Sequence, residues 1–126
     1  SRRYRALPLW MTLIAYGKAG YREQIERHCG YAQRIAAWIN ESPSFQLLCE
    51  VRLNLLVFRY FRDACSPTAL AELNKQVLSN LNSSGELYIT PTTYKGEYAL
   101  RLSISNWMTQ VEDIDRVTAA LKRAAD

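Results

Sequence analysis

A chain of 126 residues, of which 48% are hydrophobic and 22% are charged, has the size and composition of one folded domain, which excludes an intrinsically disordered protein. Its longest uncharged run, residues 6–17, is shorter than the ~20 residues that span a bilayer, and no secretory signal is visible, so we expect no membrane partner. Three cysteines, an odd number without CxxC spacing, favour a reducing, cytoplasmic location.

The first third of the chain predicts two helices. Residues 4–18 are apolar on every side, so we expect a helix that is buried on most sides and closed by Gly20, with Pro8 in or near its first turn. Residues 21–42 predict a second helix with one apolar face and a charged, solvated face. The apolar face carries Ile25, Cys29, Ala32, Ile35, Ala36 and Ile39.

Two strands follow, over residues 45–50 and 53–61. The second is apolar on both faces, which predicts a central position in its sheet. We expect its face made of Leu56, Phe58 and Tyr60, like the first helix, to meet another domain or subunit.

The second half of the chain predicts two further helices and two strands. The boundaries follow from a serine N-cap followed by proline, from a Lys-Gly turn and from a T-x-x-E capping box. The elements are a helix over 66–81, strands over 87–92 and 97–106, and a helix after Thr109 and Glu112. The order ααββαββα indicates the α+β class, with a four-stranded antiparallel sheet.

The strand over 97–106 carries an arginine in an unusual setting. Alternation places Tyr98, Leu100, Leu102 and Ile104 on the core face, and Ala99, Arg101, Ser103 and Ser105 on the other. A solvated face usually carries several long polar side chains. One arginine among three small residues leaves room for a ligand or another domain to approach, which makes Arg101 the candidate binding residue.

Four stretches together resemble one family. They are SRRYRALPLW, LNLLVFRYF, LNKQVLSNLNSSGELYITPTTYKGEYALRLSISN and VEDIDRVTAALKRAA. In this order they are similar to the C-terminal part of the pyridoxal-phosphate-dependent group II amino acid decarboxylases, which include the aromatic amino acid, glutamate, histidine and diaminobutyrate enzymes. The most specific piece is the LNxxxLxxLNxSGxxYIT run followed closely by LRLSISN.

The resemblance implies that the chain is a piece of a longer lyase, a cytoplasmic homodimer that binds pyridoxal phosphate and acts on an amino acid as its small-molecule substrate. Residues 1–42 would then be linking helices from a large cofactor-binding domain, and residues 43–126 the small C-terminal domain. The family's Schiff-base lysine follows a histidine, and none of the four lysines here does. We therefore expect no catalytic residue and no bound cofactor in this piece, which should be inactive alone.

Arg101 is the residue that this piece can contribute to the active site, because the arginine at the matching place in related folds faces the substrate. A guanidinium pairs well with a carboxylate. Tight binding of the α-carboxylate would oppose its loss as neutral carbon dioxide, so Arg101 should hold a side-chain carboxylate, or the α-carboxylate only loosely. The alternative is that Arg101 makes a salt bridge between domains or donates a hydrogen bond to a main-chain carbonyl.

The sequence contains further candidate residues and admits two other classes of protein. The arginines at positions 2 and 3 are expected to anchor the linking segment, and His28 beside Cys29 lacks the geometry of a metal or nucleophile site. The net charge of +4 and the aromatics of VFRYF admit a small RNA-binding sheet, but the basic residues are scattered instead of forming a stripe, so we expect no nucleic acid partner. A noncatalytic interaction or regulatory domain stays an alternative.

Overall fold

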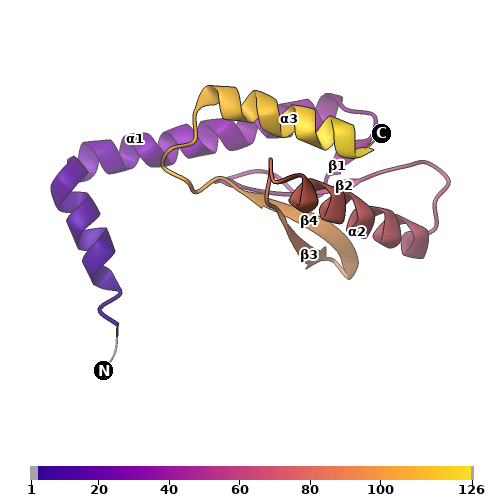
Figure 1. Ribbon diagram of the computed structural model, residues 1–126, viewed down its shortest axis with the longest axis horizontal. Coiled ribbons are helices and arrows are strands. Elements are labelled where there is room, and N and C mark those ends of the chain that lie inside the picture. Colours follow the sequence, from indigo (N-terminus) through magenta and orange to yellow (C-terminus); the bar gives the residue numbers. More distant parts are fainter. Residues whose placement is uncertain (1–2, 126) are drawn as a thin grey trace.

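The computed structural model describes residues 3–125, which form a four-stranded antiparallel sheet with helices packed on one face (Figure 1). This confirms the predicted α+β class. The elements in chain order are α1 (Ala6–Glu41), β1 (Phe45–Leu47), β2 (Leu55–Tyr60), α2 (Pro67–Ser84), β3 (Thr90–Tyr94), β4 (Glu97–Ser103) and α3 (Val111–Ala125).

Helix α1 contains a sharp bend that divides it into two parts. Gly17 has φ 67° and ψ 179°, which is not helical, whereas helical structure continues on both sides of it. We call residues 6–16 the arm; it points away from the rest of the molecule (Figure 1). Two helices were predicted here, but the break lies three residues before Gly20. Pro8 sits in the first turn, as expected, where its missing N–H costs nothing.

The sheet has the strand order β1-β2-β4-β3, so β2 and β4 are its central strands. Leu56 of β2 pairs with Leu102 of β4, and Phe58 pairs with Leu100. All four side chains point to the helical layer and are at most 4% exposed. The second part of α1 adds Ala32, Ile35, Ala36 and Ile39 to this core, as its apolar face predicted.

One prediction about the sheet was wrong. The face made of Leu56, Phe58 and Tyr60 does not wait for another domain, because α1 and α2 of this chain cover it. Phe58 and Tyr60 each lie about 6 Å, centroid to centroid, from the ring of Phe45. Rings held in the core cannot stack on bases, which removes the argument for an RNA-binding sheet.

Several boundaries also differ from the prediction. The strand predicted from residue 87 begins at Thr90, because the N–H and C=O of Ile89 bond to the side chain of Asn82 instead of a strand. Helix α3 begins at Val111, and its first turn uses Asp113, whose carboxylate accepts the N–H of Gln110 at 2.9 Å. The T-x-x-E capping box therefore does not form.

Candidate functional site

The structure places Arg101 in the middle of β4, on the face of the sheet that no helix within residues 3–125 covers. Its partners across the ladders are Val57 of β2 and Thr90 of β3. Its neighbours Leu100 and Leu102 are buried, whereas Arg101 itself is exposed. The alternation predicted for this strand is confirmed.

We call this surface the open face. It comprises Leu55, Val57 and Arg59 of β2, Ala99, Arg101 and Ser103 of β4, and Thr90 and Thr92 of β3, which share one side by strand alternation and register. Leu55 is 37% exposed, although it is a large apolar side chain on a central strand. A central, partly apolar face that lacks a second layer is typical of a surface that another domain covers.

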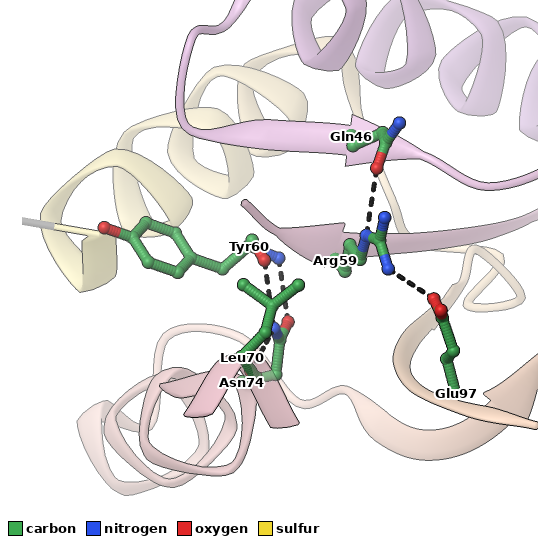
Figure 2. A network of polar contacts seen from close by, with 6 residues as sticks. All are labelled: Gln46, Arg59, Tyr60, Leu70, Asn74 and Glu97. Carbon is green, nitrogen blue, oxygen red and sulfur yellow. Dashed lines mark hydrogen bonds and ion pairs between the residues drawn. The ribbon is translucent and has the colours of Figure 1, made fainter. Parts of the chain in front are cut away.

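A second arginine lies on the open face and was missed by the sequence analysis. Arg59 is two residues along β2 from Val57, the partner of Arg101, so the two arginines occupy diagonal positions on the same face. Arg59 donates from Nε to Oε1 of Gln46 at 2.9 Å and pairs with the carboxylate of Glu97 (Figure 2). Its side chain is only 17% exposed. The sequence pattern shows on which side of β2 Arg59 lies, but it does not show the partners of Arg59. These partners are 13 and 38 residues away in the sequence, on other strands.

Arg101 differs from Arg59 in its partners. Within residues 3–125, no ion pair includes Arg101, and its guanidinium makes one hydrogen bond, from Nε to the hydroxyl of Thr90 at 3.1 Å. A guanidinium has five N–H donors, so most of its binding capacity is free. Of the two arginines on the open face, Arg101 is therefore the one available to an incoming carboxylate.

Two asparagines of α2 hold the helix against the strands that border the site. Asn74, which is 1% exposed, accepts the N–H of Tyr60 at 2.8 Å and donates to the carbonyl oxygens of Tyr60 and Leu70 (Figure 2). Asn82 makes the equivalent pair of bonds to Ile89. Each asparagine side chain thus satisfies a backbone N–H and C=O that would otherwise need a neighbouring strand as partner. The sequence feature that could have indicated these contacts is the Leu-Asn pair that occurs twice in this helix, at residues 73–74 and 81–82.

The described residues do not fit a covalently bound aldehyde cofactor. All four lysines are exposed. A hydrogen bond from Lys75 to Glu72, at 2.7 Å, together with the charge of Glu72, raises the pKa of Lys75 and keeps its amine protonated. A nucleophilic lysine needs the opposite shift.

A surface cavity of about 520 Å³ between α2 and the β3–β4 turn does not match a phosphate group either. Two cationic side chains line this cavity, and both already form ion pairs: Arg59 with Glu97, and Lys75 with Glu72. Burial raises the pKa of Tyr98 in the same wall, so this phenol stays neutral at physiological pH.

The remaining candidate residues of the sequence do not form a second site among residues 3–125. His28 is buried and Cys29 half-buried in α1, and no cluster of three or more His, Cys, Asp or Glu side chains within residues 3–125 could hold a metal ion. Arg3 is exposed, and Arg2 lies outside the described residues. Over the same part of the chain, no helix has both the length and the apolar character required to cross a bilayer.

Comparison with known proteins agrees with this picture. Residues 1–61 match the family model described as the pyridoxal-dependent decarboxylase conserved domain. The aromatic-L-amino-acid decarboxylase of Drosophila lebanonensis is 32% identical over 99% of this chain and 29% of its own length. The histidine decarboxylase of Drosophila melanogaster is 31% identical over 99% of this chain and 14% of its own length.

Solved structures share the fold. The tryptophan decarboxylase of Catharanthus roseus, solved with L-tryptophan, has a TM-score of 0.86 and 30% identity over 99% of this chain and 26% of its own. The Oryza sativa enzyme solved with PLP and tryptamine has a TM-score of 0.88 at 23% identity, covering 98% of this chain and 27% of its own. The family model, the curated relatives and the solved structures together support a fragment of a pyridoxal-dependent decarboxylase, and the chain spans less than a third of the length of these relatives.

Proposed function

We propose that this chain is the C-terminal part of a pyridoxal-phosphate-dependent amino acid decarboxylase, a lyase, and that it closes the active site with its open face. The support is the combination of similarity to decarboxylases over nearly the whole chain with a central sheet face on which residues 3–125 place no second layer. In the whole enzyme the cofactor would supply the electron sink for carbon dioxide loss. The share of this chain is to position charge and to exclude water.

The residue that acts in this proposal is Arg101, as a contact to a substrate carboxylate. The observation that carries it is the contrast on the open face: Arg59 bonds to Gln46 and pairs with Glu97, whereas within residues 3–125 Arg101 bonds only to the Thr90 hydroxyl. The exposed guanidinium fits a side-chain carboxylate, or an α-carboxylate that is held only loosely. A tightly held α-carboxylate would be stabilised in the ground state and not in the transition state.

The proposed arrangement uses two parts of the chain. Residues 1–42 are the linking helices and residues 43–126 the small domain, although the second half of α1 also contributes side chains to the small domain's core. The arm exposes Leu9, Trp10 and Ile14 by 49%, 58% and 64%. Such a surface is suited to a large domain of the same chain. We place the enzyme in the cytoplasm, as a homodimer.

The test uses the whole enzyme and this chain side by side. The whole enzyme should release carbon dioxide from at least one of the aromatic amino acids, histidine, glutamate or diaminobutyrate when pyridoxal phosphate is present. The 126-residue chain alone should release none, and borohydride should not trap the cofactor at one specific lysine, because no lysine here follows a histidine as the family's Schiff-base lysine does. Turnover by the chain alone would contradict the proposal, and so would a whole enzyme that decarboxylates none of these amino acids.

A further inference from the structure

The bend in α1 depends on a single residue. Gly17, with φ 67° and ψ 179°, occupies a region of backbone space that is essentially restricted to glycine. Asparagine tolerates left-handed helical angles, but those require ψ near +47°, so it does not suit this conformation. Any other residue at position 17 therefore favours a different path for the chain.

Packing does not explain why glycine stands here. A Cβ atom built on Gly17 meets no atom within 4 Å, so the residue does not make room for a neighbour. Gly30 of the same helix also has open space around its position, but its φ is not positive. The two glycines therefore differ in backbone conformation and not in crowding, which makes Gly30 a matched control.

The bend separates two surfaces that are both open. On one side lies the arm, with its exposed apolar residues; on the other lies the body that carries Arg101 on the open face. Figure 1 shows the arm leaving the axis of the rest of α1 at this point. If position 17 became helical, α1 would continue straight and the arm would point elsewhere relative to the open face.

We propose that Gly17 is a positioning residue: its bend fixes the angle between the arm, which is anchored on the large domain, and the open face, and so places the Arg101 guanidinium at the substrate carboxylate. This inference rests on the proposed function. Misplacement of a binding group by about 1 Å can cost as much as a hundredfold in rate. A small change in the angle of the helix at position 17 is enlarged over the distance to β4, and so displaces the Arg101 side chain.

The test is a double-mutant cycle in the purified whole enzyme loaded with pyridoxal phosphate. The variants are Gly17→Ala, Gly17→Asn, Gly30→Ala, Arg101→Met and Gly17→Ala combined with Arg101→Met. For each, kcat and KM for the preferred amino acid are measured together with cofactor content and melting temperature.

We expect both Gly17 variants to lower kcat/KM by about tenfold to a hundredfold, mainly through KM, with cofactor content unchanged. Gly30→Ala should leave kcat/KM unchanged with an equal or slightly higher melting temperature. In the Arg101→Met background, Gly17→Ala should have no further effect, because the contact that it misplaces is already gone.

Each contrary result has a distinct meaning. Normal kcat/KM in Gly17→Ala, alongside a loss in Arg101→Met, overturns the role of the bend and leaves the proposed function standing. Additive losses in the double variant, or a Gly17→Ala enzyme that fails to fold, show that the bend acts on something other than Arg101 and also overturn it. Normal kcat/KM in Arg101→Met removes the proposed role of Arg101, and the positioning role falls with it.

Discussion

At the scale of single residues, two side chains of the same type on the same face have opposite environments. Arg59 is mostly buried and bonded to Gln46 and Glu97, whereas Arg101 is exposed and, among the residues that the structure describes, bonded only to Thr90. Burial and satisfied hydrogen bonds are typical of a residue that stabilises the fold. An exposed guanidinium with free donors is not typical of a residue that only stabilises the fold, and such a group is a candidate for binding.

A buried amide gives the sharpest prediction about stability. Asn74→Ala leaves both the N–H and the C=O of Tyr60 without their partner in the interior, which should lower the free energy of unfolding by about 2–4 kcal/mol. The control is Asn80→Ala, an exposed asparagine of the same helix, which should change it by less than about 0.5 kcal/mol. Urea unfolding of both variants checks this; equal stabilities would show that the Asn74 bonds contribute nothing.

At the scale of elements, most of the fold was predictable because local signals and hydrophobic patterns agree. Ser66 was expected to cap α2, and its Oγ accepts the N–H of Ala69. The Lys95–Gly96 turn has positive φ at both residues, as a tight hairpin requires. The period-2 pattern of β4 gave both its core face and the exposed position of Arg101.

The elements that were misjudged depend on contacts distant in sequence. The open-face side of β2 could not be distinguished from its core side by the sequence pattern alone, because Leu55 and Val57 are as apolar as Leu56 and Phe58. Which side the helices cover is settled by the packing of α1 and α2. The start of β3 was missed for the same reason, since the side chain of Asn82 takes the bonds that a strand at Ile89 would make.

At the scale of the whole molecule, the arm has an apolar surface that no other part of residues 3–125 covers. Trp10, Met11, Ile14 and Tyr16 are each at least 57% exposed. We expect the 126-residue chain to self-associate, because such a surface favours contact with any apolar partner. Replacing Trp10 and Ile14 with glutamine should weaken this association. Sedimentation velocity measures both; a monodisperse monomer of the unaltered chain at high concentration would contradict the expectation.

The most direct measurement compares Arg101→Met with Arg59→Met in the whole enzyme, because both remove a guanidinium from the same face. We expect Arg101→Met to lower kcat/KM by about thirtyfold to a thousandfold, the loss of a charged contact worth about 2–4 kcal/mol, with an unchanged melting temperature. Arg101→Lys should recover only part, because an ammonium lacks the two parallel donors of the fork.

Arg59→Met should show the reverse, a lower melting temperature with near-normal turnover per folded molecule, because it breaks the bonds to Gln46 and Glu97. An Arg101→Met enzyme with normal kcat/KM and a lowered melting temperature would contradict the account and make Arg101 a residue that stabilises the contact between domains.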